Sequence, residues 1–302
     1  MLTNGQITRK AREALRGNWV TATAFYLLAL IIIFVVTFLL EFIFAVPEKV
    51  SGFLALGLDG AIVKYFVQYI LEWMILSPII VGIFRLFYHA AERRPILIQD
   101  IFHGFKWECF WRNNFTILME RFVETFFGLL MVIPCVLGVK KILTDIFLGS
   151  NFNYASPMDI VLHGTSLHVG AFVALFIFTF FCIFIVPALN AIYYIIATHR
   201  EIGVLRTFQT AFTLVNCHRA KYWRFYSRFF FWYVPSFTLF LVATFAKVPA
   251  GVSVICYLAA AVAALIPTVY MLTASIIFFR ELEKDYVEKN PGEAANYMAD
   301  FQ

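Results

Sequence analysis

The chain has 302 residues, of which 62% are apolar and 14% are charged, and its net charge is +5. Soluble domains contain roughly 45–50% apolar and about 25% charged residues. The composition therefore excludes an ordinary water-soluble domain, a disordered chain and a fibrous repeat, and it indicates a polytopic membrane protein.

The first residues predict a surface helix rather than a cleavable signal. Ile7, Ala11 and Leu15 recur at helical spacing within residues 4–17. Four basic residues share this stretch: Arg9, Lys10, Arg12 and Arg16. This pattern is typical of a basic amphipathic helix that lies on the cytoplasmic membrane face. The apolar stretch that follows exceeds the roughly 7–15 residues of a secretory signal, so we expect it to span the membrane.

Six apolar stretches are each long enough to span a bilayer, for which about 20 residues suffice. They are expected at about Trp19–Val46, Ala61–Ala91, Phe115–Val139, Thr165–Thr198, Phe225–Ala246 and Gly251–Phe279. Pro78, Pro187 and Pro267 lie in the even-numbered spans and predict helix kinks. The expected fold class is all-α, with one membrane domain over residues 1–302 and six transmembrane helices.

The positions of lysine and arginine predict the orientation. These residues concentrate at both ends of the chain and in the loops after the second and fourth spans, whereas the three opposite loops carry fewer. Because short cytoplasmic loops are enriched in lysine and arginine, we expect both termini in the cytoplasm. Lys140 and Lys141, in one of the opposite loops, run against this expectation.

A threefold internal repeat is visible in the spacing of prolines and glutamates. A glutamate follows the proline of each even-numbered span after fourteen residues, in the pairs Pro78 and Glu92, Pro187 and Glu201, and Pro267 and Glu281. The predicted units, each made of a surface helix and two spans, are residues 4–92, 96–201 and 204–281, and residues 282–302 form a polar tail. The alternative is that amphipathic linkers and interfacial tryptophans occur in any six-span protein.

Amphipathic stretches precede the third and fifth spans. Leu97, Ile101 and Phe105 share one helical side of the first stretch. Leu205, Phe208 and Val215 lie on one side of the second. We expect interfacial helices at both places, on the cytoplasmic side and equivalent to the N-terminal one.

Several short motifs resemble those of one bacterial integral-membrane family. The stretch from Ala11 to Trp19 is similar to its opening Ala-Arg-x-x-Leu-Lys-Gly-Asn-Trp. Gly82, with residues 100–106, resembles its glycine-bearing span end and its Phe-x-Gly-Phe-Lys loop. Its Ile-Pro-Gly span and basic surface helix are matched by Val186, Pro187, Tyr193, Tyr194 and residues 208–221, with departures at Ala188 and at Cys217, His218 and Arg219. The family is catalogued as domain of unknown function nine hundred seventy-five. The resemblance implies a bacterial inner-membrane protein without an established activity.

Charged residues within spans are costly and therefore mark candidate functional positions. Glu72 is the deepest acid, and Arg85 lies roughly 20 Å further along the same helix at 1.5 Å per residue. We expect Arg85 to meet Glu120 or Glu124, while Arg121 and Arg228 enter the membrane at a similar depth. These residues predict a polar vestibule or a proton-linked path that opens to the cytoplasm. The alternative is interfacial snorkelling with structural ion pairs.

Two other features of the spans predict packing. Asn190 follows Pro187 by three residues and can bond a freed carbonyl or a neighbouring span. Small residues, which permit close helix contact, recur in the sixth span: Ala259, Ala260, Ala261, Ala263 and Ala264. We expect these alanines to form a packing seam, with a pore wall as the alternative.

No motif predicts a cofactor, a metal or a catalytic centre. Asp159, His163 and His168 lie in one loop, but no HExxH motif or second acid accompanies them. The five cysteines include no CxxC pair. The basic surface helices favour anionic membrane lipid over nucleic acid as a partner, and a protein partner or a homo-oligomer stays open.

These observations predict a non-enzymatic module that binds or transports a small or lipidic solute. Its site would use the proline-broken spans, Glu72 and the group formed by Arg85, Glu120 and Glu124, because many transporters bind at broken helices. The alternative is a scaffold or assembly subunit, held by the surface helices and the alanine seam. A membrane-embedded enzyme has the least support from the sequence.

Overall fold

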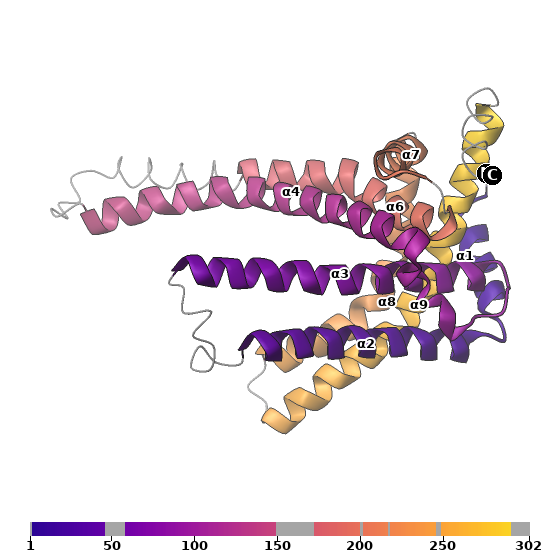
Figure 1. The fold of residues 1–302 in the computed structure, drawn as a ribbon, viewed down its shortest axis with the longest axis horizontal. Coiled ribbons are helices and arrows are strands. Elements are labelled where there is room, and N and C mark those ends of the chain that lie inside the picture. Colours follow the sequence, from indigo (N-terminus) through magenta and orange to yellow (C-terminus); the bar gives the residue numbers. More distant parts are fainter. Residues whose placement is uncertain are drawn as a thin grey trace. The chain divides into compact units, whose positions relative to one another are not determined.

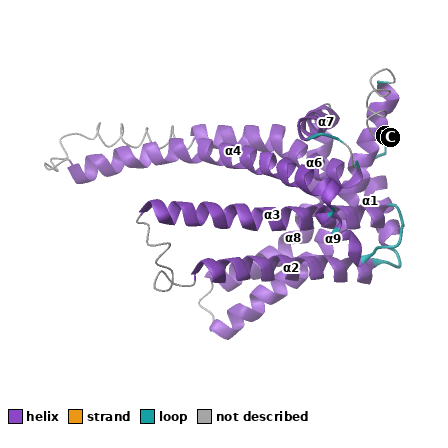
Figure 2. Cartoon of the chain, in the orientation of Figure 1, coloured by secondary structure: helices purple, strands orange, loops and turns teal. Residues whose placement is uncertain are grey.

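The computed structural model of the protein describes residues 2–45, 58–148, 172–199, 202–216, 218–245 and 249–290. Within these residues every regular element is helical, which confirms the all-α fold class (Figure 2). The chain divides into two compact units, one formed by residues 1–116 and 190–302 and the other by residues 117–189.

Figure 1 shows the helices in chain order. The first unit holds most of them: α1 (Asn4–Leu15), α2 (Trp19–Ala45), α3 (Leu58–Ala91), α7 (Val204–Asn216), α8 (Arg219–Phe245) and α9 (Ala250–Lys289). Two helices begin in one unit and end in the other, namely α4 (Trp107–Leu148) and α6 (Val186–Thr198). Residues 172–180 are helical and lead through a π-helical turn, Phe181–Ile185, into α6, so Pro187 lies just after a change of helical register.

Five helical segments are long and apolar enough to cross a membrane. They are Trp19–Ile43, Val67–Ala91, Phe172–Thr198, Arg219–Phe245 and Gly251–Lys289. The third predicted span falls within α4, which is a continuous helix but is not one of the five. Its apolar run is interrupted by Glu120, Arg121 and Glu124, so a sixth crossing stays a prediction.

The predicted N-terminal helix is present as α1, but its apolar side faces the protein. Ile7, Ala11 and Leu15 are fully buried, and α1 packs on α9, α3 and α8. Thr3 caps the helix, because its hydroxyl accepts a hydrogen bond from the backbone N–H of Gln6 at 3.3 Å. The sequence predicted that this face lies on the lipid surface. In the structure the same face forms part of the protein core.

The segment after α3 differs from the expected amphipathic helix. It forms two short 3₁₀ turns, Ile98–Asp100 and His103–Phe105, which pack against α3. A Cβ atom on Gly82 would lie 1.9 Å from the carbonyl oxygen of Ile101. A Cβ atom on Gly104 would lie 2.3 Å from the carbonyl oxygen of Pro78. The two glycines therefore let the segment lie directly on the α3 backbone, a contact that a regular helix with side chains could not make.

Hydroxyl groups join α8 to α9. Tyr226 shares a hydrogen bond with Ser275 at 2.9 Å, and Tyr233 shares one with Thr268 at 2.9 Å. Ser236 donates to the carbonyl oxygen of Ala260 at 2.7 Å. This bond ends on the backbone of one residue of the expected alanine seam, and the packing seam itself stays a prediction. The polar bonds along the two helices add direction to their contact.

Candidate functional site

Glu72, the deepest predicted acid, lies half-buried on α3 beside α2. The hydroxyl of Thr37 on α2 donates to its Oε1 at 3.4 Å. No basic side chain pairs with Glu72 within the described ranges. Thr37 is 18 residues beyond Trp19, or roughly 27 Å along α2 at 1.5 Å per residue. Glu72 therefore lies far along the α2–α3 pair from the end where α2 begins.

Arg85 and Arg112 both contact the C-terminal end of α6. Arg85 Nη1 donates to the carbonyl oxygen of Ala197 at 3.4 Å, and Arg112 Nη1 donates to that of His199 at 3.0 Å. Cations are favourable there because the last carbonyls of a helix lack partners and carry partial negative charge. This geometry favours a helix-capping role for Arg85.

The predicted acids of the third span belong to the second unit, together with Arg121. Arg121 Nη1 donates to Glu124 at 2.7 Å, and its Nε lies 3.7 Å from Oε2 of the buried Glu120. Arg85 belongs to the first unit. Its pairing with Glu120 or Glu124 therefore stays a prediction. Asp159, His163 and His168 lie outside the described residues.

Polar and aromatic side chains around Asn190 make packing contacts with other helices. Asn190 Nδ2 donates to the hydroxyl of Tyr222 on α8 at 2.6 Å. Tyr193 stacks on Phe84, with ring centroids 4.9 Å apart, and the Tyr194 hydroxyl donates to Glu283. These contacts join α6 to α8, α3 and α9. Asn190 thus bonds a neighbouring helix, one of its two expected roles.

A cluster of ion pairs surrounds the last turns of α9, which extends ten residues past the predicted end at Phe279. Two of its contacts join permanently charged groups and reach the end of α3 and α1, namely Arg280 with Glu92 (3.8 Å) and Glu281 with Lys10 (3.7 Å). Two more join a carboxylate to a histidine and reach the end of α6 and the start of α8, namely Glu283 with His199 (2.9 Å) and Asp285 with His218 (3.3 Å). We call it the α9 ion-pair cluster. Two of the three repeat glutamates, Glu92 and Glu281, belong to it, while Glu201 lies outside the described residues.

His218 couples this cluster to the start of α8. Burial lowers the pKa of His218 more than the nearby carboxylate of Asp285 raises it, and the positive charges of Lys289 and Lys221 lower it further. Lys289 also bonds Asp285 at 2.6 Å. The net shift favours the neutral form of the imidazole at neutral pH.

A basic pocket lies where the first turn of α1 meets the first turns of α8. It encloses about 530 Å³ and is lined by Leu2, Thr3, Asn4, His218, Ala220, Lys221, Arg224 and Arg228. Lys221, Arg224 and Arg228 share one face of α8 because of their i, i+3, i+7 spacing. The sequence singled out Arg228 alone, although this spacing was a signal that could have grouped all three.

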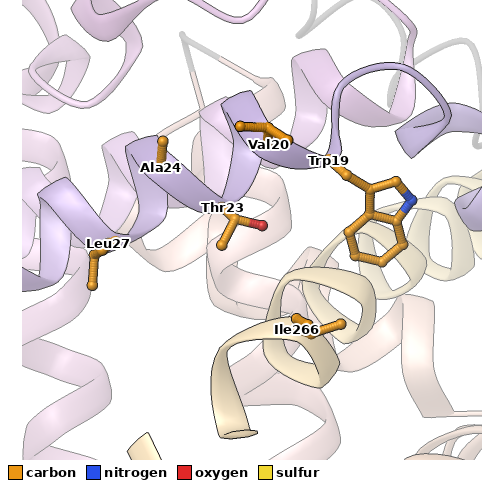
Figure 3. Close-up of a pocket in the computed structure, with 6 residues that line it drawn as sticks. All are labelled: Trp19, Val20, Thr23, Ala24, Leu27 and Ile266. Carbon is orange, nitrogen blue, oxygen red and sulfur yellow. The ribbon is translucent and has the colours of Figure 1, made fainter. Parts of the chain in front are cut away.

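An apolar groove lies between α2 and α9. It encloses about 530 Å³ and is lined by Trp19, Val20, Thr23, Ala24, Leu27 and Ile266. The Trp19 ring and the Thr23 side chain extend from α2 toward Ile266 (Figure 3). Val20 is 83% exposed and Ile266 is 56% exposed, so the groove opens to the surroundings of the protein.

Tyr270 lies against the groove and against the two helices, α1 and α8, that line the basic pocket. Its ring lies 6.1 Å from that of Trp19, which lines the groove, and 5.4 Å from that of Phe229, the neighbour of Arg228. Its hydroxyl donates to the carbonyl oxygen of Thr8 in α1 at 2.8 Å. One aromatic residue therefore contacts the groove lining and the two helices that carry the pocket, α1 and α8. Neither hollow was predicted from the sequence.

Comparison with known proteins adds the family and nothing about activity. No curated protein and no solved structure matches the chain. The model of one family, described as protein of unknown function (DUF975), matches residues 1–286. This match covers nearly the whole chain and confirms the family that the short motifs resembled, so the chain belongs to the DUF975 family.

Proposed function

We propose that the chain is a multi-pass protein of the bacterial inner membrane, with both termini in the cytoplasm, that binds a membrane lipid without changing it chemically. The observation that carries the proposal is the apolar groove of α2 and α9 beside the basic pocket of α1 and α8. A lipid needs an apolar surface for its chains and a polar place for its headgroup. Tyr270 contacts Trp19 of the groove, and through Phe229 and Thr8 it contacts α8 and α1, the two helices whose first turns line the pocket.

The orientation proposed here agrees with the distribution of charge in the structure. The basic pocket, the exposed arginines of α1 and the α9 ion-pair cluster all lie near the start of α2 and the end of α3, because α1 and α9 contact each other and α3 there. The inner leaflet of a bacterial membrane is anionic and attracts such a surface. The sixth crossing, through α4, completes an even number of spans and brings the two ends to one side.

Filling the groove tests the proposal. Thr23→Trp places an indole toward Ile266, so we expect the protein purified in mild detergent to retain less phospholipid than the wild type. Val35→Trp is the matched control, because Val35 lies on α2 with 45% of its surface exposed but does not line the groove. Native mass spectrometry counts the retained lipids. Equal retention in both variants would refute the groove as the binding place.

A second candidate function, the scaffold or assembly subunit, is favoured by the α9 ion-pair cluster. The cluster ties the ends of α1, α3, α6 and α8 to one helix, which suits a rigid cytoplasmic platform. The same native mass spectra discriminate between the two candidates. Stoichiometric protein partners without bound lipid would favour the scaffold.

A further inference from the structure

We infer that the basic pocket binds the headgroup of an anionic glycerophospholipid that carries a hydroxyl next to its phosphate. The inference rests on the proposed function and names the headgroup class of its ligand. The phosphate lies among the basic side chains of α8 and the first turn of α1. The headgroup hydroxyl donates to Asn4.

The cations of the pocket are available for an anion. Within the described part of the chain, no carboxylate forms an ion pair with Arg224 or Arg228. The carboxylates that α9 brings to this region have cations of their own, because Asp285 has Lys289 and Glu281 has Lys10. Lys221 Nζ donates to the carbonyl oxygen of Leu2 at 2.7 Å and so ties the N-terminal segment to α8.

The first turn of α1 contributes backbone donors. Thr3 satisfies the N–H of Gln6, but the N–H groups of Asn4 and Gly5 have no preceding carbonyl within the helix. The positive end of the helix dipole adds to their attraction for an anion. Arg228 approaches this turn, since a Cβ atom on Gly5 would lie 3.8 Å from Arg228 Nη1.

Asn4 distinguishes the pocket from a surface where arginines merely snorkel. Its side chain is 6% exposed, and its Nδ2 donates to the carbonyl oxygen of Lys221 at 3.5 Å. Asn4 lines the pocket, and its buried Oδ1 has no hydrogen-bond partner within the described residues. A buried acceptor without a donor is costly. A phosphodiester offers no proton at neutral pH, so a hydroxyl on the same headgroup is the donor that fits.

The size and surroundings of the pocket favour a lipid as the source of this phosphate. Its volume of about 530 Å³ lies in the range of small-molecule sites. A free phosphate would leave most of this volume empty. The apolar groove beside Tyr270 provides a place for an acyl chain.

Native mass spectrometry of the full chain in mild detergent tests the inference. The protein is offered phosphatidylglycerol, phosphatidic acid and phosphatidylcholine with identical acyl chains. We expect phosphatidylglycerol to be retained most. Two arginines near a membrane surface contribute roughly fivefold each to anion binding, so Arg224→Gln with Arg228→Gln should lower this retention by more than about tenfold. Arg12→Gln with Arg16→Gln removes the same charge outside the pocket and should leave it near the wild-type value.

Asn4→Asp provides a second variant that is not expected to disturb folding. An acidic residue in the first turn of α1 interacts favourably with the helix dipole, which offsets the loss of the 3.5 Å bond from Nδ2 to the carbonyl oxygen of Lys221, so thermal stability should change little. The added negative charge should nevertheless abolish the preference for phosphatidylglycerol over phosphatidylcholine.

The outcomes separate the two proposals. Lipid bound without headgroup preference, or a preference kept in the Arg224 and Arg228 variant, overturns the headgroup site and leaves the proposed function standing. No bound lipid of any class overturns both. Displacement of the lipid by inorganic phosphate alone shows a free-phosphate site and overturns the lipid source.

Discussion

Replacing Gly82 by alanine tests the direct contact between α3 and the segment that follows it. The new Cβ atom would lie 1.9 Å from the carbonyl oxygen of Ile101. An ordinary C···O contact is about 3.3 Å, so the segment must move by about 1.4 Å. Overpacking of this kind costs about 1–3 kcal/mol, and the upper end applies because the obstacle is backbone. The higher helix propensity of alanine offsets about 1 kcal/mol, which leaves a net loss of about 2 kcal/mol.

Thermal unfolding in detergent, followed by tryptophan fluorescence, measures this loss. A large domain changes its Tm by roughly 2–4 °C per kcal/mol, so Gly82→Ala should lower Tm by about 4–8 °C. Gly128→Ala is the control, since nothing lies within 4 Å of the Cβ atom it would add on α4. It should keep or raise Tm. An unchanged Tm for Gly82→Ala would refute the backbone contact between α3 and the 3₁₀ turns.

Three further predictions concern polar side chains. Glu72→Gln keeps a partner for the Thr37 hydroxyl but removes a charge from the membrane, so it should raise the free energy of unfolding by at least about 1 kcal/mol and raise Tm with it. A lower Tm would indicate that Glu72 has a cationic partner. Asn190→Leu should cost about 1 kcal/mol through loss of the bond to Tyr222. Tyr222→Phe should destabilise the Asn190→Leu variant much less than it destabilises the wild type, and a double-mutant cycle of Tm values measures the difference. The pKa of His218 is lowered in the folded protein, so its contribution to stability is present above pH of about 6.5 and is lost as the pH falls. His218→Gln should flatten the dependence of Tm on pH between about 5 and 7.

The apolar runs predicted the ends of the long helices α2 and α3 well because each run carries its own signal. The first predicted span ends within one residue of α2, and the second ends with α3 at Ala91. The end of α9 could not be predicted in the same way. Charged residues follow Phe279, and in isolation they indicate a solvated tail. Each of Arg280, Glu281 and Glu283 instead pairs with a side chain from another helix, and such long-range partners leave no local pattern.

The candidate site was predictable only in part for the same reason. A single acid or base in an apolar run, such as Glu72, can be recognised from the sequence. The basic pocket combines Asn4 with residues of α8 that lie more than 210 positions away. The basic residues of the pocket on α8 recur at a recognisable helical spacing, whereas no sequence pattern marks Asn4 as a buried hydrogen-bond acceptor. Asn4 looks like an ordinary residue at the start of a helix until the fold places it against Lys221.

The burial of α1 changes what its amphipathic pattern means. A basic helix with an apolar side ordinarily binds a bilayer by inserting that side among the lipids. The apolar side of α1 is already occupied, because Ile7, Ala11 and Leu15 have no exposed surface and the carbonyl of Thr8 accepts from Tyr270. One face cannot be buried in lipid and in protein at the same time. The basic residues of α1 lie on its other side, and the first turn of the helix forms one wall of the basic pocket. A hydrophobic pattern therefore identifies a face that must be buried, and only the packing of the chain decides what buries it.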